Sequence, residues 1–163
     1  EIAVMAILGM FIGRFGFRRT IAIGAFAYFA RYLIWGLISL QEPSGPSVDV
    51  SGQFIWTVPL VIGIFSQLLH GVCYACFFAS AYMYVDKIAD DDIRNSAQTV
   101  FGIIILGLGP MLAAPLLGFL ANIFGEAGVV TDFAGMWLSL AAIAFITSAV
   151  FFVAFTEEAE SSI

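Results

Sequence analysis

Four side chains that can carry charge, bind protons or form hydrogen bonds lie inside long apolar stretches of this sequence: Glu1, Arg31, His70 and Tyr74. Glu1, Arg31 and Tyr74 each stand twelve or thirteen residues from a charged loop residue, which corresponds to about 18–20 Å at the rise of an α-helix. His70 lies one helical turn from Tyr74 on the same face. Ionisable groups are costly inside an apolar span and mark functional or paired positions there. We therefore expect these residues to form one polar site at a common depth.

Structural roles are open for the same residues. Arg31 can form an interhelical ion pair with an acid such as Glu1, or it can take part directly in substrate binding or proton coupling. His70 can hydrogen-bond to a nearby backbone or serine oxygen, or it can belong to the site. Tyr74 and Phe78 can simply pack, because aromatic residues make up 15% of the chain.

The two cysteines, Cys73 and Cys76, form a C-x-x-C pattern close to His70. Such a pattern can bind a metal or carry redox chemistry. Here it lies within an apolar helix and has no suitably spaced fourth ligand, so we expect packing cysteines, with neither a metal nor a cofactor. The sequence also has no nucleotide-binding loop, nucleophile elbow or zinc-helix signature, which argues against an enzyme.

The elements that must position these residues are membrane helices. Of the 163 residues, 61% are hydrophobic and 11% are charged, and the mean hydropathy is +1.01. A helix needs roughly 20 apolar residues to cross a bilayer. Such runs lie at 21–40, about 55–85, about 99–124 and about 133–155, after a truncated run at 1–13. We predict an all-α, polytopic membrane bundle of about five helices and, because the first run is short and lacks an initial Met, further helices upstream.

Five of the six Lys and Arg residues lie in two of the connecting loops. Counting the crossings puts these two loops on the same side of the membrane. By the positive-inside rule this side is cytoplasmic, and so is the C-terminus. We therefore expect a multi-pass protein that contacts the lipid bilayer and has no nucleic-acid partner. The residues of these loops that are candidates for a cytoplasmic gate are Arg14, Arg18, Arg19, Asp86, Lys87 and Arg94.

The first of these loops carries a recognisable pattern. Residues 9–19, GMFIGRFGFRR, resemble the Gly-x-x-x-Asp-Arg-x-Gly-Arg-Arg signature of the major facilitator superfamily. Gly13 stands where the signature has aspartate, which is typical of the weaker copy between helices 8 and 9. The resemblance implies that residues 1–163 are the C-terminal part of a single transporter, helices 8 to 12, and that the remaining helices precede them.

A second resemblance runs through three segments: LHGVCY at 69–74, YVDK at 84–87 and RNSAQ at 94–98. Together they are similar to the nucleoside:proton symporter family. In that family a Glu, a Tyr and a Phe of helices 8 and 10 bind the nucleoside, and their positions match Glu1, Tyr74 and Phe78. A carboxylate can accept ribose hydroxyls, a phenol can hydrogen-bond and an aromatic face can stack on a base.

This resemblance implies a proton-coupled transporter that imports nucleosides by alternating access across a bacterial-type cytoplasmic (inner) membrane. Its proton coupling, or its buried polar network, would involve Glu1, Arg31 and His70. Two other hypotheses stay open. One is a symporter of the same superfamily for sugars, oligosaccharides or another small solute, and the other is a non-transporting membrane scaffold in which Arg31 and Glu1 merely pair.

Overall fold

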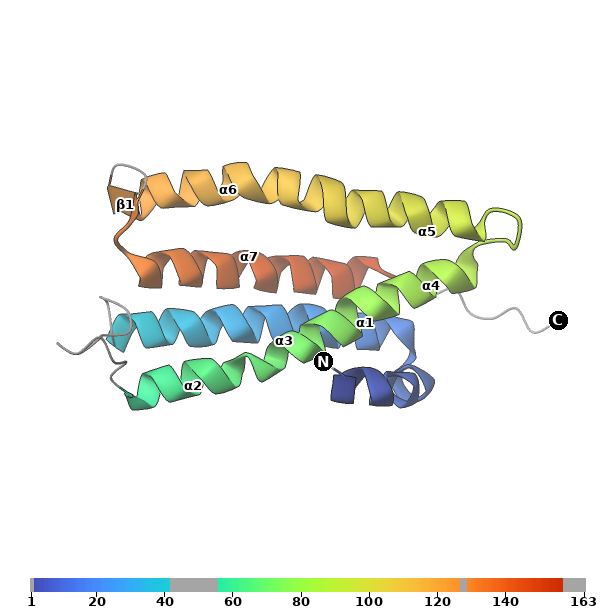
Figure 1. Cartoon of the computed structure of the whole chain (residues 1–163), viewed down its shortest axis with the longest axis horizontal. Coiled ribbons are helices and arrows are strands. Elements are labelled where there is room, and N and C mark those ends of the chain that lie inside the picture. Colours follow the sequence, from blue (N-terminus) through green and yellow to red (C-terminus); the bar gives the residue numbers. More distant parts are fainter. Residues whose placement is uncertain (1, 42–55, 127–128, 157–163) are drawn as a thin grey trace.

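The computed structural model of the chain describes residues 2–41, 56–126 and 129–156. Glu1 lies outside the described residues, as do the loop at 42–55 and the end of the chain at 157–163. In the described part, four helical stretches are long and apolar enough to cross a membrane: Ile2–Gln41, Val58–Ile88, Arg94–Ile123 and Phe133–Ala154. They run lengthwise through an elongated bundle (Figure 1), so the expected all-α membrane architecture is confirmed.

The first stretch, α1 (Ile2–Gln41), consists of two helical segments joined at Gly16. Gly16 has φ 75° and ψ 171°, a conformation that residues with a Cβ rarely adopt. The chain reverses at this point, and the short N-terminal segment folds back beside the other helices (Figure 1). The turn therefore brings the arginine-rich sequence around Gly16 to one end of the bundle.

The second stretch contains a π-helical segment that the sequence does not predict. The whole stretch begins at Thr57, which caps its first helix by accepting a hydrogen bond from the amide of Leu60. In π-helix the backbone bonds run from i to i+5, and such segments are frequent at functional sites. The elements that follow Thr57 are α2 (Val58–Ser66), α3 (Leu68–Val72), η1 (Cys73–Ala79) and α4 (Ser80–Ile88).

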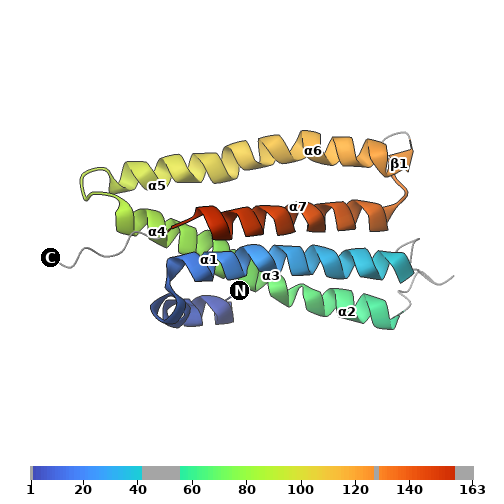
Figure 2. The same ribbon diagram turned by 180° about the vertical axis from the view of Figure 1, so that it is seen from behind.

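The third stretch also has a π-helical segment, η2, which ends two residues before Pro110. Proline has no amide hydrogen, so the preceding turn loses a backbone hydrogen bond and can rearrange. The stretch is built from α5 (Arg94–Ile103), η2 (Ile104–Leu108) and α6 (Gly109–Ile123). Leu120 is the one buried residue of these three elements. Figure 2 shows the stretch at the edge of the bundle, beyond the last helix.

A short antiparallel ladder connects the third stretch to the fourth. It pairs β1 (Gly125–Glu126) with β2 (Val129–Val130), where the sequence predicts only a loop. Asp132 then caps the last helix, α7 (Phe133–Ala154), by accepting a hydrogen bond of 2.9 Å from the amide of Gly135.

The bundle is organised around α1, which packs against α7 and against η1. The crossing with η1 is close, because a Cβ added to Gly24 would lie 2.7 Å from the carbonyl carbon of Cys76 and 2.8 Å from the Cβ of Phe77. Cys73 and Cys76 are 0% and 1% exposed. Small side chains thus let two backbones meet in a part of the molecule where larger ones would separate them.

We predict that Gly24→Ala destabilises the protein, because the added methyl group meets the backbone of η1 rather than the movable end of a side chain. Overpacking of this kind costs about 1–3 kcal/mol, to be measured as a lower melting temperature of the full-length protein in detergent. Gly118→Ala is the matched control, since a Cβ at Gly118 meets nothing within 4 Å. If Gly24→Ala melts like the wild type, α1 and η1 do not cross this closely.

Candidate functional site

The candidate site lies where α1 crosses α3 and η1, and it is built around a contact between Arg31 and His70. Nη1 of the Arg31 guanidinium lies 3.1 Å from Nδ1 of the His70 ring. Both side chains are half-buried. Arg31 comes from the long segment of α1, and His70 comes from the turn of α3 that precedes η1. The contact therefore links two different spans of the chain.

The chemistry of the two groups fixes the proton on the imidazole. A guanidinium only donates hydrogen bonds and stays charged in proteins. Nδ1 of His70 must therefore accept, which leaves a neutral ring with its proton on Nε2. A further nitrogen of Arg31, Nε, is buried without a hydrogen-bond partner among the described residues. Arg31 thus keeps one buried donor that can bind an additional acceptor.

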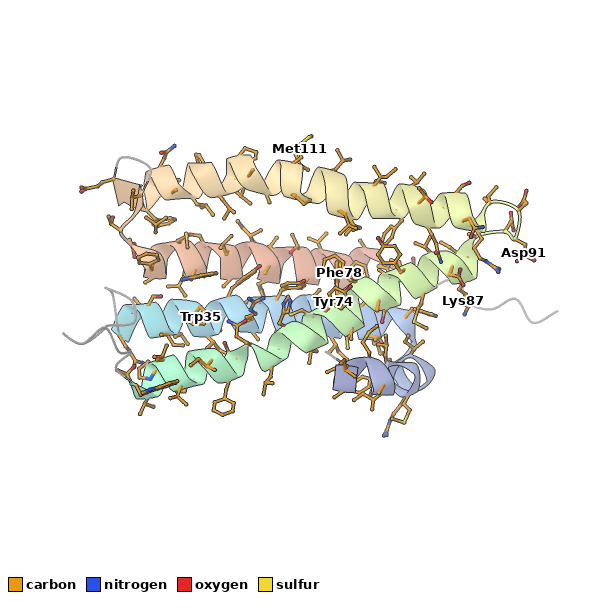
Figure 3. All side chains as sticks on the ribbon, viewed as in Figure 1. Trp35, Tyr74, Phe78, Lys87, Asp91 and Met111 are labelled. Carbon is orange, nitrogen blue, oxygen red and sulfur yellow. The ribbon has the colours of Figure 1, made fainter. Side chains whose placement is uncertain are left out.

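Aromatic side chains continue the site along η1. The ring centroids of Tyr74 and Phe78 lie 5.9 Å apart, and Tyr74 is 45% exposed. Tyr28 of α1 meets the ring of Phe78 edge-on at 6.5 Å. Figure 3 shows Tyr74 and Phe78 together where this stretch passes over α1. The structure thus brings four residues predicted at the site into one region, while the fifth, Glu1, lies outside the described residues.

Sequence reasoning does not single out the tyrosines that flank Arg31. Tyr28 lies three residues before Arg31, one helical turn away on the same face of α1, and this spacing is the signal that identifies it. Tyr32 stacks on Trp137 of α7, with centroids 5.9 Å apart and an interplanar angle of 25°. These ring contacts join α1 to η1 and to α7, and so fix the helix that carries Arg31.

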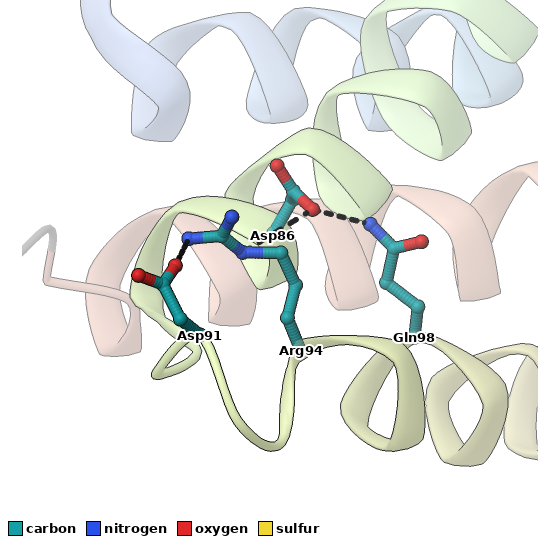
Figure 4. A network of polar contacts seen from close by, with 4 residues as sticks. All are labelled: Asp86, Asp91, Arg94 and Gln98. Carbon is teal, nitrogen blue, oxygen red and sulfur yellow. Dashed lines mark hydrogen bonds and ion pairs between the residues drawn. The ribbon is translucent and has the colours of Figure 1, made fainter.

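A second polar cluster lies at the end of the bundle where α4 turns into α5 (Figure 4). Gln98 donates a hydrogen bond of 2.8 Å to Oδ1 of Asp86, and Nε of Arg94 lies 3.7 Å from the same oxygen. Nη2 of Arg94 lies 2.6 Å from Oδ1 of Asp91. The side chains of Arg94 and Asp86 are 42% and 48% exposed, so solvent screens their attraction. The cluster therefore orients the turn more than it stabilises the fold.

The other charged residues predicted at the gate form separate contacts around the same end of the bundle. Arg18 donates to the backbone carbonyl of Phe152 near the end of α7, and its guanidinium carbon lies 4.9 Å from the centroid of that ring. Nζ of Lys87 lies 5.7 Å from the centroid of Phe17. The exposed arginines on either side of the turn at Gly16 are Arg14 and Arg19.

Comparisons with known proteins agree with this architecture. The fold is similar to the crystal structure of the nucleoside transporter NupG (D323A mutant), with a TM-score of 0.76 and 21% identity over 96% of this chain and 35% of that one. In sequence, the chain is 30% identical over its whole length to the putative nucleoside transporter YegT of Escherichia coli (strain K12). It is 24% identical over 95% of its length to the xanthosine permease of the same organism. The chain spans about a third of these two relatives, 36% and 33%.

The helices and their arrangement have the major facilitator superfamily fold, and the chain is a multi-pass membrane protein. The resemblance in the arginine-rich turn predicts this fold correctly. The family model of the nucleoside H+ symporters matches residues 1–160. The chain belongs to the nucleoside H+ symporter family.

We predict that Nδ1 of His70 stabilises the fold by accepting from Arg31. In His70→Asn the amide oxygen can replace Nδ1, whereas His70→Phe removes the acceptor and leaves a buried donor of a cation unpaired. Such a loss costs about 1.5–3 kcal/mol. His70→Phe should therefore melt at a lower temperature than His70→Asn, as measured by thermal unfolding of the full-length protein in detergent.

The control for this prediction is Arg31→Met in the His70→Phe background, which removes the unpaired cation and should restore part of the lost stability. Equal melting temperatures for His70→Asn and His70→Phe would contradict the contact.

Proposed function

We propose that the chain forms part of a proton-coupled transporter that imports nucleosides by alternating access. Its family membership supports this proposal. The observation that carries it is the Tyr74–Phe78 ring pair, in which Tyr74 is 45% exposed and which lies on the same span as His70 of the half-buried Arg31–His70 contact. Because the chain spans about a third of its relatives, the remainder of the binding site would come from helices outside residues 1–163.

In this proposal the nucleoside lies against η1. Phe78 stacks on the base, a contact that contributes about 1–3 kcal/mol, and the edge of Tyr28 holds its ring in place. The exposed hydroxyl of Tyr74 hydrogen-bonds to the nucleoside. Glu1, assigned by resemblance to the family, accepts ribose hydroxyls. Stacking and hydrogen bonding together favour a nucleoside over a sugar, which offers no aromatic base to Phe78.

Proton coupling in this proposal acts through Arg31 and His70, with Glu1 as the acid of the same network. A neutral His70 accepts from Arg31, whereas a protonated His70 places a second positive charge 3.1 Å from the guanidinium. Repulsion between two half-buried cations breaks the contact. Proton uptake then loosens α3 from α1 and shifts the balance between two conformations of the transporter. The other titratable groups near this contact are Tyr28, Tyr32, Cys73 and Tyr74.

The end of the bundle that carries the arginine-rich turn faces the cytoplasm of a bacterial-type inner membrane in this proposal, because basic loops are retained on that side. The C-terminus is then cytoplasmic as well. The Asp86–Arg94–Gln98 cluster holds the α4–α5 turn at this end. Its weak, solvent-screened pairs suit a gate that opens and closes, since little free energy separates the paired from the unpaired state.

For substrate binding, we predict that Phe78→Ala weakens uridine binding about fivefold or more, as expected for loss of a base-stacking ring. Tyr74→Phe, which removes one hydroxyl, should weaken it about threefold to tenfold. The measurements are uridine binding and uptake by the full-length transporter in proteoliposomes. Tyr82→Phe is the matched control, because this ring packs on Phe101, away from the site. Uridine uptake that is competed by sugars and unaffected by Phe78→Ala would contradict the proposal.

For proton coupling, we predict that His70→Asn still exchanges labelled uridine across the membrane at equal pH but no longer accumulates it under a pH gradient. The amide preserves the acceptor for Arg31 and cannot take up a proton. Concentrative uptake and counterflow, measured on the same proteoliposomes, separate the two properties. If His70→Asn accumulates uridine like the wild type while Glu1→Gln does not, coupling runs through Glu1 and not through His70.

A further inference from the structure

We propose that this protein binds an anionic phospholipid in a groove between α1 and α7, with the phosphate on Arg19 and an acyl chain along the groove. The groove has a volume of about 510 Å³. Its walls are aliphatic and aromatic, and Arg19 is the charged residue in its lining. Phe26 and Phe145, one from each helix, are each 50% exposed along it. This inference does not depend on the identity of the transported solute.

The position of the groove fits one leaflet of a bilayer. On the long segment of α1 it follows Arg19, Ala22 and Phe26, which recur at helical spacing along one face; Phe15 lines it from the other side of the turn at Gly16. From Arg19 to Phe26 the helix rises about 10 Å, compared with about 15 Å for half of the hydrocarbon core. The arginine stands at the end of the groove nearest the turn at Gly16, and the apolar walls extend from there toward the middle of the membrane.

Two neighbouring arginines have different roles at this end. Arg18 is engaged with α7, because it donates to the carbonyl of Phe152 and lies over its ring. That contact fixes Phe152, which is itself a wall of the groove. Arg19 is exposed and makes no hydrogen bond or ion pair within the part of the chain that the structure describes. The result is a preformed apolar groove that ends at an exposed arginine, which is available to a ligand.

Charge and shape together select the ligand. A guanidinium binds phosphate oxygens through paired, charge-assisted hydrogen bonds. Basic pockets between transmembrane helices bind anionic lipid head groups, and among the described residues no carboxylate lines this groove to repel one. A second apolar groove of about 470 Å³, where α1 faces α2 and α3, has no charged residue in its lining. Apolar shape alone would fit lipid chains in both grooves, whereas only Arg19 adds a preference for a negative head group.

The lipid groove is separate from the candidate substrate site. Tyr28, Tyr32 and Phe77 line a different cavity, of about 440 Å³, on another face of the α1–α7 pair. Neither Tyr74 nor Phe78 is among the residues that line the lipid groove, so a lipid there contacts α1 and α7 without meeting these two residues. Its physical effect is to bridge two helices whose packing fixes Arg31.

The test compares binding of phosphatidylglycerol and phosphatidylcholine with the same acyl chains to the detergent-solubilised, full-length transporter, followed by native mass spectrometry and by melting temperature. We expect tighter binding of phosphatidylglycerol. Arg19→Gln should lower its affinity about fivefold, and Arg19→Lys, which keeps the charge but loses the paired hydrogen bonds, should lower it less. Arg14→Gln is the matched control, because it removes the same charge from the same turn without lining the groove.

A second variant tests the acyl-chain part of the site. Ala149→Phe fills the exposed floor of the groove and should weaken both lipids without altering the charge. Its melting temperature in lipid-free detergent reports whether it is folded, and the Arg19 variants test the proposal independently of it. The proposal is overturned if both lipids bind the wild type equally. It is also overturned if Arg14→Gln loses as much affinity as Arg19→Gln, since binding is then due to general surface charge.

Discussion

At Gly24 the backbone of α1 lies against the backbone of η1, close enough that even a methyl group there would meet Cys76 and Phe77. Two helical turns further along α1, this crossing brings Arg31 within 3.1 Å of His70. The small residues at the crossing determine the distance between the two helices. A wider crossing would move the guanidinium away from the imidazole, so the polar contact depends on packing at a residue that has no side chain of its own.

The π-helical geometry of η1 complements this constraint. Cys73, Ala75 and Cys76 face the packed interior, while Tyr74 stays 45% exposed between them in sequence. The cysteines act as small apolar residues, and within the described part of the chain no group of three or more metal-ligand side chains includes them. One short segment thus combines a tightly packed side, which holds α1, with an aromatic side that remains accessible. A tightly packed surface and an accessible aromatic surface are therefore coupled through the same turn.

Local patterns predict the elements well and their contacts poorly. Runs of apolar residues locate the spans because lipid imposes a minimum helix length, and the arginine-rich turn and the residues around His70 and Tyr74 indicate the superfamily and the family. From the sequence, the expected partner of Arg31 is an acid such as Glu1, and the expected partner of His70 is a backbone or serine oxygen. Arg31 and His70 meet because of the register of α1 against α3. This register is fixed by the close contact of Gly24 with η1, more than forty residues further along the chain. The π-helical segment η1 also escapes prediction, because no local sequence signal such as a proline accompanies it.

Our central proposal is that Tyr74 faces the path of a nucleoside while the residues beside it are packed in the protein. Reaction of Tyr74→Cys in the full-length protein with a hydrophilic, membrane-impermeant thiol reagent tests this proposal most directly. The natural Cys73 and Cys76 are 0% and 1% exposed and provide an unreactive background. The account predicts that the cysteine at position 74 reacts from the aqueous phase and that uridine protects it. A cysteine that reacts only with lipid-soluble reagents, or at a rate that uridine does not change, would contradict the account.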